Sequence, residues 1–302
     1  MFALKLLIGL LIIFFLLRKF DFEQVAKTLW SIPLVYVLLT IVLYMLINLM
    51  SALKVYTMLM SMDNKKASIY GLYKNYSLSW ALGLFVPGKI GELSMIYFLK
   101  EYDLETGPSA AIVVIDKLTM FIILTIISTV GFFMFLTGTE TIKLLAFLAV
   151  GYGIAFFFIF SSFGRDVIKR LILRKTSDKF AGFSKVLFSQ IRKKANMLLI
   201  FALGFIKWAI NGFILYILLL YFNQQASFLQ VFIVSSIVTI ISYIPITFNG
   251  LGLRESSAIL LFNLIGLDEA IVLSCFIYTL ILAYVLGVFH LLLSFNKLKN
   301  IK

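Results

Sequence analysis

The feature that most constrains this chain is a series of apolar segments, each about as long as a helix that crosses a bilayer. Such a helix needs about 20 predominantly apolar residues. Six segments meet this requirement and are predicted to be full transmembrane helices: residues 2–17, 32–53, 118–136, 144–163, 197–222 and 270–295. The composition agrees, because 62% of the 302 residues are hydrophobic and only 14% are charged. A soluble domain has about 45–50% apolar and ~25% charged residues, so a soluble enzyme, a disordered chain and a nucleic-acid-binding module are excluded.

Two further apolar regions are interrupted by helix-breaking residues. The first, residues 68–104, contains Pro87, and the second, residues 228–266, contains Pro245 and Gly250. A break frees backbone N–H and C=O groups that lipid cannot satisfy, so each break is expected where protein covers it or where it lines a water-filled cavity. These regions are therefore interpreted as hairpins of broken helices. The alternative is that each is one kinked full span, which gives eight spans.

The distribution of basic residues favours hairpins over kinked spans. The loop at residues 164–196 carries ten basic and two acidic residues, so the positive-inside rule places it in the cytoplasm. If both broken regions re-emerge on the side where they enter, the N-terminus, the loop with Lys65 and Lys66, and the basic C-terminus all share that side. The prediction is an all-α polytopic protein of the cytoplasmic membrane, with about six full spans, two re-entrant hairpins and both termini in the cytoplasm.

The order of elements also indicates an internal repeat within one membrane domain, residues 1–302. A span, a broken hairpin and a span recur at an offset of about 160 residues, which divides the chain into halves at residues 1–140 and 141–302. Because the first hairpin enters from the cytoplasm and the second from outside, the halves are predicted to be inverted. Inverted repeats with broken helices near the bilayer midplane are typical of secondary transporters.

Charged residues stand directly beside both breaks. Lys89 and Glu92 follow the first break, and Arg254 and Glu255 follow the second. A charge near the bilayer centre costs at least ~2.5–3.5 kcal/mol, which indicates a function for these residues. We expect Lys89 and Arg254 to bind phosphate, helped by the N-termini of the short helices that follow each break. Glu92 and Glu255 are expected to pair with a basic residue in the empty state or to take a proton.

Other polar residues are predicted to belong to the same site. Asp116 and Lys117 lie near the start of a span and cannot both face lipid, so they are assigned to ion pairing or proton coupling. Lys207, Asn211 and Asn249 are predicted to face the cavity. The substrate-binding set also includes the glycines of the two breaks, which are Gly88, Gly91, Gly250 and Gly252.

Three motifs resemble one protein family in order and spacing over nearly the whole chain. Residues 87–100 read PGKIGELSMIYFLK, residues 116–118 read DKL, and residues 245–255 follow the pattern P-x-x-x-N-G-L-G-L-R-E. These motifs resemble the lysylphosphatidylglycerol synthase transmembrane region family, which comprises flippase-like membrane domains. The resemblance implies movement of lipids with charged headgroups, or of polyprenyl-phosphate-linked sugars, across the cytoplasmic membrane.

The chain departs from the family pattern in three places. Lys89 stands where arginine is common, and Asp116 and Lys117 stand where a Glu-Arg pair is usual. The aspartate that often follows this pair is absent, with Met120 and Phe121 in that stretch, so no relay through it is expected. No soluble aminoacyl-transferase domain follows the last motif, so the synthase activity of the fused enzymes is not expected.

The predicted function is a flippase for a phosphate-bearing lipid, such as an anionic or aminoacylated phospholipid or a polyprenyl-phosphate-linked sugar. The main alternative is a small-anion secondary transporter or channel, because an anion site at the midplane does not by itself specify a lipid. A membrane glycosyltransferase or an accessory subunit is less favoured. One histidine, one cysteine and scattered carboxylates provide neither a nucleophile–base pair nor a metal cluster.

The expected partners follow from the same observations. We expect no enzyme activity, no cofactor, no bound metal and no nucleic acid. Membrane lipids are the expected partners, with anionic headgroups at the basic loop. The sequence leaves the oligomeric state open, and a homodimer is one option.

Overall fold

The structure is a computed structural model that describes residues 2–64, 66–135, 138–161, 163–164, 180–244 and 246–294. These residues form α-helices, short 3-10 helices and connecting turns, which confirms the all-α class for the described part of the chain. Lys65, Pro245, most of the basic loop and the C-terminal lysines lie outside the described residues. The predicted side of the membrane for those segments therefore stays a prediction.

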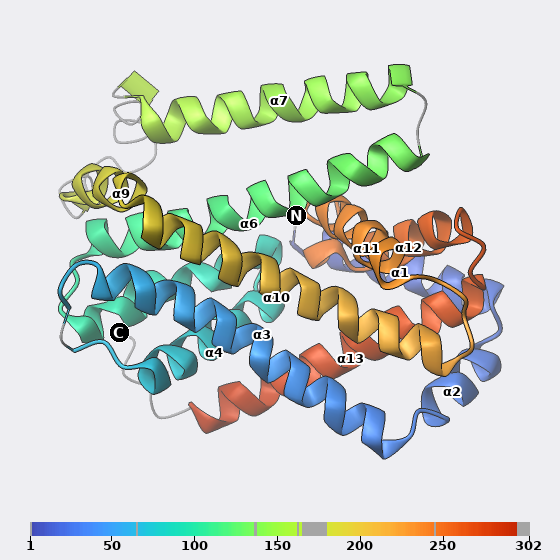
Figure 1. Cartoon of the computed structure of the whole chain (residues 1–302). Coiled ribbons are helices and arrows are strands. Elements are labelled where there is room, and N and C mark those ends of the chain that lie inside the picture. The colour runs from blue at the N-terminus through green and yellow to red at the C-terminus, as the bar shows by residue number, and fades with distance from the viewer. Residues whose placement is uncertain are drawn as a thin grey trace.

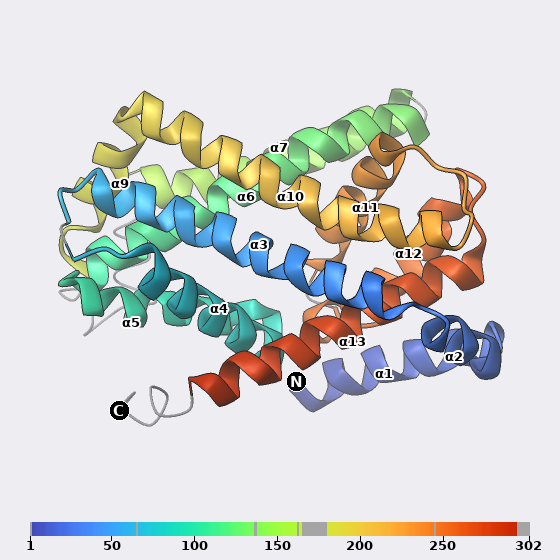
Figure 2. The ribbon, with the colours of Figure 1, turned by 60° about the horizontal axis from the view of Figure 1, so that its bottom comes forward.

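Four helices are long and apolar enough to cross a membrane, counted within the described residues. They are α3 (Leu34–Met60), α6 (Thr106–Phe135), α10 (Lys194–Tyr221) and α13 (Glu269–Leu293). Two further apolar helices are α1 (Phe2–Lys19) and α7 (Gly138–Phe160). Figures 1 and 2 show the long helices running along the longest dimension of the molecule. The chain is therefore a multi-pass membrane protein.

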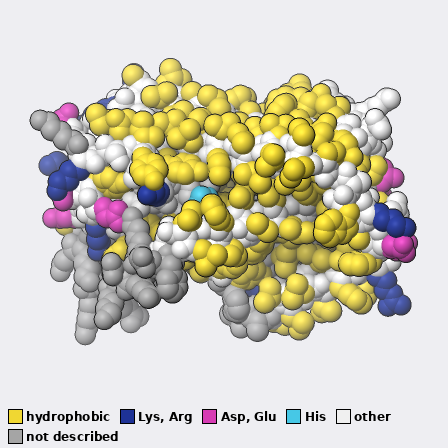
Figure 3. Space-filling model, turned by 90° about the horizontal axis from the view of Figure 1, so that it is seen from below, with side chains coloured by type: hydrophobic (Ala, Val, Ile, Leu, Met, Phe, Trp, Pro, Cys, Tyr) yellow, Lys and Arg dark blue, Asp and Glu magenta, His cyan; other side chains and the backbone are white. Residues whose placement is uncertain are grey.

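The outer surface is that of a protein in lipid. Large apolar side chains are widely exposed, among them Leu34 at 69%, Leu198 at 73% and Leu292 at 69%. In Figure 3, apolar side chains cover the middle of the face shown, and most of the charged side chains gather toward the two ends. A soluble monomer rarely exposes apolar patches larger than a few hundred Å². The apolar middle therefore marks the part in contact with lipid tails.

The first broken region is a hairpin that returns to the end of the molecule from which it starts. It comprises α4 (Ile69–Phe85), the 3-10 helix η1 (Pro87–Ser94), α5 (Met95–Phe98) and the 3-10 helix η2 (Leu99–Tyr102). An ion pair between Lys66 and Asp103 joins its two ends, and the Asn64 side chain donates to the Tyr102 carbonyl at 2.7 Å.

The returning arm of this hairpin differs from the prediction. A short helix was expected after the first break, but only Met95–Phe98 is α-helical, and the segments on either side of it are 3-10. The close packing of Gly91 on α4 gives the reason. A Cβ atom at Gly91 would lie 2.2 Å from the Leu82 carbonyl oxygen, so the two arms approach backbone to backbone and the returning arm follows the tighter helix.

The second broken region is a hairpin at the opposite end. It comprises α11 (Phe228–Ser242), the 3-10 helix η5 (Phe248–Gly250) and α12 (Leu253–Asn263). The Asp268 N–H donates to the Gln224 side chain at 2.8 Å and joins its two ends. In Figure 1, α4 lies in one half of the molecule, and α11 and α12 lie in the other half.

Helix α3 shows that the two hairpins enter from opposite ends. Near its start, the Ser31 carbonyl accepts a hydrogen bond from Tyr221, which is close to the second hairpin. Just after its end, the Ser61 hydroxyl donates to Gln190, close to the first hairpin. Helix α3 also continues seven residues beyond the predicted end at Leu53, which brings Lys54 into the interior.

Two short helices were not predicted. They are α2 (Phe22–Trp30) and α9 (Phe183–Arg192), one at each end of the molecule. Both are too short to cross a bilayer, and neither contains a run of about 20 apolar residues.

Candidate functional site

The two breaks are joined by one side chain, Asn249. Its amide oxygen accepts from the Lys89 backbone N–H at 3.0 Å, and its amide nitrogen lies within 3.0–3.2 Å of the carbonyl oxygens of Gly83, Leu84 and Val86. These carbonyls stand at the C-terminal end of α4, where the helix offers them no partner. Lys89 and Asn249 both have left-handed backbones, with φ of 57° and 51°. Backbone groups that lipid could not satisfy are thus satisfied where the hairpins meet.

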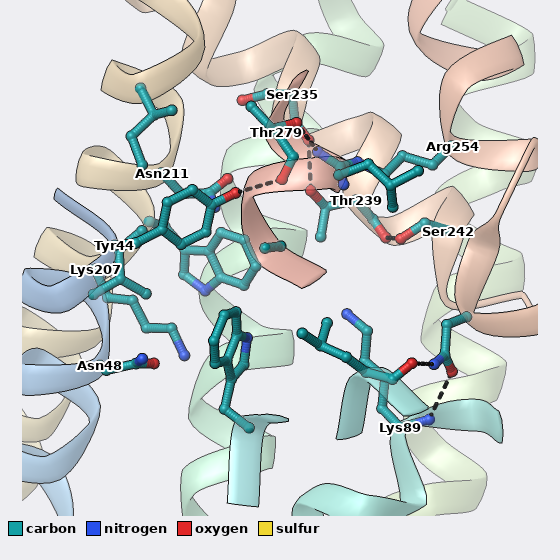
Figure 4. A pocket seen from close by; sticks show the side chains of 18 of the residues that line it. Tyr44, Asn48, Lys89, Lys207, Asn211, Ser235, Thr239, Ser242, Arg254 and Thr279 are labelled. Atoms are coloured by element: carbon teal, nitrogen blue, oxygen red, sulfur yellow. Dashed lines mark hydrogen bonds between the residues drawn. The ribbon is translucent and has the colours of Figure 1, made fainter. Parts of the chain in front are cut away.

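A cavity of about 180 Å³, lined by both polar and apolar residues, lies beside this junction (Figure 4). Its lining comes from α3, α4, η1, α6, α10, α11, η5, α12 and α13, so both hairpins and the long helices border it. The polar residues of the lining are Tyr44, Asn48, Tyr76, Lys89, Glu92, Lys207, Asn211, Ser235, Thr239, Ser242, Tyr243, Asn249, Arg254, Thr279 and Tyr284. The cavity therefore brings together Lys89, Glu92, Lys207, Asn211, Asn249 and Arg254, all of which sequence analysis singled out.

Three of the cations around the cavity form no ion pair with any described carboxylate. They are Lys89 from the first break, Lys207 from α10 and Arg254 from the start of α12. Figure 4 shows them on different sides of one space. The Lys89 ammonium lies 3.4 Å from the Tyr243 hydroxyl, and the Arg254 guanidinium donates to the Thr279 hydroxyl at 3.0 Å.

Aromatic rings hold these cations in place of carboxylates. The pairs, measured to ring centroids, are Lys89 over Tyr243 at 4.4 Å, Lys207 over Tyr76 at 5.6 Å and Arg254 over Phe276 at 4.9 Å. A cation–π contact contributes about 0.5–2 kcal/mol but does not neutralise the charge. These contacts therefore leave the positive charges of the three cations unneutralised.

A second group of charges beside the cavity is paired. Lys54 forms an ion pair with Asp116 at 2.5 Å, and Lys117 bridges Glu92 and Asp116, the latter at 3.6 Å. Tyr76 donates to Asp116 at 3.2 Å. Lys54 and Asp116 are almost completely buried, with 1% and 4% of their surface exposed. The structure thus places Glu92, Asp116 and Lys117 in one network, as ion pairing requires.

Lys54 is the charged residue that sequence reasoning missed. It follows directly after Leu53, the predicted end of a span. The apolar residues that continue after it, at Val55, Met58 and Leu59, were the signal, because they extend the helix by about two turns. All three are buried, so Lys54 lies on a helix face that points inward.

Glu255 does not form an ion pair with Arg254 in the described structure. Its carboxylate instead accepts from the Gly252 N–H at 2.7 Å and caps α12. A carboxylate at a helix N-terminus is stabilised by the helix dipole, and here it occupies a position that was expected to receive the substrate. Glu255 is fully buried, and its second oxygen has no hydrogen-bond partner among the described residues.

The glycines of the predicted binding set shape the breaks and do not line the cavity. Gly252 shows this most directly, because it has φ of +78° and a Cβ there would lie 2.8 Å from the Gly9 carbonyl oxygen of α1. The other three, Gly88, Gly91 and Gly250, are likewise absent from the described lining.

The site carries a net charge of +2 when every ionisable side chain is charged. Its cations are Lys54, Lys89, Lys117, Lys207 and Arg254, and its carboxylates are Glu92, Asp116 and Glu255. An uncompensated charge is costly to bury, so this net positive charge favours a bound anion.

The fold and the site define a helical membrane protein in which two broken hairpins, from opposite ends, meet beside a cationic cavity. The chain belongs to the lysylphosphatidylglycerol synthase transmembrane region family, whose model matches residues 2–289. This match confirms the resemblance found in the three motifs. Neither the curated proteins nor the solved structures give a match to the chain.

Proposed function

We propose that this protein is a flippase for a phosphate-bearing lipid and that the cavity binds the phosphate during transfer. The observation that carries the proposal is the set of three cations without carboxylate partners, Lys89, Lys207 and Arg254, around one cavity where the hairpins meet. They come from three separate elements, so a bound phosphate would connect both halves of the chain. Membership of a family of lipid-related membrane domains supports the same conclusion.

The size of the cavity supports a headgroup rather than a whole lipid as the bound group. Its volume of about 180 Å³ is smaller than the roughly 300–1,000 Å³ of sites that enclose a drug-sized ligand. In the proposed mechanism the phosphate enters the cavity while the acyl or prenyl chains stay in the surrounding bilayer. The extensive apolar outer surface is compatible with chains that remain in lipid.

The proposed transfer uses the opposed hairpins. Phosphate draws Lys89 and Arg254 from their aromatic rings and is held by charge-assisted hydrogen bonds, which are stronger than the contacts they replace. Rocking of the two halves then exposes the phosphate to each side in turn, as inverted repeats allow. Glu92, Asp116 and Glu255 are candidates for proton coupling, and Glu92 is the one that lines the cavity.

The proposal includes a topology. We assign six full spans, two inverted halves and a location in the cytoplasmic membrane. The loops near Lys66 and Lys193 then lie in the cytoplasm with both termini, and the connection at residues 223–227 lies outside. The lipid itself is the partner, and the protein transfers it without chemical change.

Transport by purified protein in liposomes tests this proposal. Wild-type protein should accelerate the exchange of fluorescent phosphate lipids between leaflets, relative to protein-free liposomes. Arg254→Lys should lose at least tenfold in rate because an ammonium cannot reproduce the planar fork of a guanidinium, whereas Lys89→Arg should retain activity. Both variants should remain monodisperse in detergent.

The same liposomes distinguish the main alternative. Uptake of a soluble anion without exchange of lipid would identify a small-anion transporter or channel and contradict the flippase. Equal lipid exchange by Arg254→Lys and the wild type would leave Arg254 as a structural partner of Thr279 only.

A further inference from the structure

We propose that the cavity selects lipids whose phosphate is a terminal monoester over lipids whose phosphate is a diester. This inference rests on the proposed function, because it specifies the substrate class of the same site. It starts from the charges that remain once the internal pairs are counted. Lys54 neutralises Asp116, and Lys117 neutralises Glu92. The three remaining cations, Lys89, Lys207 and Arg254, exceed the one remaining carboxylate, Glu255, by two charges.

The excess of two charges matches a monoester. A phosphate monoester carries a charge of about −1.5 to −2 at neutral pH and has three terminal oxygens that accept hydrogen bonds. A phosphodiester carries one negative charge and has two such oxygens. A bound diester would therefore leave one positive charge uncompensated in a buried cavity, whereas a bound monoester brings the site close to neutrality.

The placement of the three cations agrees with this count. Lys89, Lys207 and Arg254 belong to η1, α10 and α12, so they approach the cavity from three directions (Figure 4). A group with three terminal oxygens offers one to each cation. A diester would offer two, and its fourth substituent would occupy space beside the remaining cation.

The indole of Trp208 provides an independent reason to expect an additional acceptor. Trp208 lines the cavity and is 91% buried, and its N–H has no hydrogen-bond partner among the described residues. An indole N–H can only donate. Asn48 and Asn211 line the same cavity and form no hydrogen bond through their side chains within the described structure. The Trp208 N–H is therefore a donor for which the described residues supply no acceptor, and the two asparagine amides are available to a ligand.

Phosphatidic acid and phosphatidylmethanol with identical acyl chains form a matched pair of probes. They differ by one methyl group, which converts a monoester into a diester and removes one ionisation. Binding to purified protein is followed by intrinsic tryptophan fluorescence, since two of the three tryptophans line the cavity. Exchange between leaflets is followed in liposomes. Wild-type protein should prefer phosphatidic acid at least tenfold in both measurements.

A charge variant and a matched control test the cause of this preference. Lys207→Gln should reduce the preference for phosphatidic acid over phosphatidylmethanol to about threefold or less, mainly by weakening the binding of phosphatidic acid. Lys207→Arg should keep the ratio, because the charge is retained. Lys74→Gln is the control, because Lys74 also stacks on an aromatic ring, that of Tyr70 at 4.2 Å, but is exposed and does not line the cavity. It should leave the ratio unchanged.

The outcomes separate this inference from the proposed function. Exchange of both lipids at equal rates would overturn the monoester preference and leave the flippase intact. A tenfold binding preference without any lipid exchange would support the monoester site and overturn the flippase. Inorganic phosphate shares the same chemistry, so its uptake into the liposomes without lipid exchange would likewise support the dianion site and identify a soluble substrate.

Discussion

Replacement of Lys54 by methionine tests the paired network that borders the cavity. Lys54 is 1% exposed, and its ammonium lies 2.5 Å from an Asp116 carboxylate oxygen. Methionine keeps most of the side-chain volume and removes the charge. Asp116 would keep a contact with Lys117 at 3.6 Å and a hydrogen bond from Tyr76 at 3.2 Å.

The expected loss follows from these distances. At an effective dielectric constant of 20, two unit charges 2.5 Å apart attract with about 6–7 kcal/mol, of which desolvation of both groups offsets a large part. Removal of one partner of a buried pair typically costs about 3–5 kcal/mol. Because Lys117 and Tyr76 remain, we expect the lower value, about 3 kcal/mol of unfolding free energy.

Thermal unfolding in detergent measures this loss. A change of about 3 kcal/mol should lower the Tm by roughly 5 °C, because the unfolding entropy of a chain of 302 residues is about 0.6 kcal/mol/K. Lys27→Met is the matched control, because Lys27 pairs with Glu23 on an exposed face and should change stability by less than about 0.5 kcal/mol. The double variant Lys54→Met with Asp116→Leu should recover at least half of the loss, since no charge is left unpaired. Equal losses for Lys54→Met and Lys27→Met, or a double variant less stable than Lys54→Met alone, would contradict a stabilising buried pair between Lys54 and Asp116.

Two further predictions concern packing and orientation. Gly252→Ala should lower the Tm at least twice as much as Gly266→Ala, because both glycines have positive φ but only Gly252 packs against α1; equal effects would contradict the contact. In a Cys275→Ser background, Gln225→Cys should react with an impermeant thiol reagent in intact cells, while Ser189→Cys should react only after permeabilisation; the reverse pattern would contradict the assigned topology.

Much of the helical content was predictable because each helix that crosses the lipid must itself consist of mainly apolar residues, whatever the other segments do. The predicted segment at residues 197–222 corresponds to α10 at Lys194–Tyr221, and that at residues 270–295 corresponds to α13 at Glu269–Leu293. Both broken regions were also located, because Pro and Gly interrupt a helix through their own backbone chemistry. Helix ends were less predictable, as the extension of α3 to Met60 shows.

The charged residues near the breaks were identifiable from their cost in a membrane, but their partners were not. Glu92 and Glu255 stand in similar positions in the sequence, yet Glu92 pairs with Lys117 and Glu255 caps its own helix. Which of these occurs depends on the helix that packs beside each carboxylate. Lys117 comes from α6, which follows the first hairpin, and no corresponding lysine reaches Glu255 in the described structure.

The sequence alone thus determined the membrane environment, the broken hairpins and the family, because each follows from local residue chemistry or from a motif. Only the tertiary structure decided that Asn249 joins the two breaks, across 160 residues, and that Lys54 neutralises Asp116. It also decided that Lys89, Lys207 and Arg254 meet around one cavity without carboxylate partners. The physical reason is that a lone charge in the membrane is costly wherever it lies, whereas its neutralisation depends on which distant side chain comes within a few ångströms.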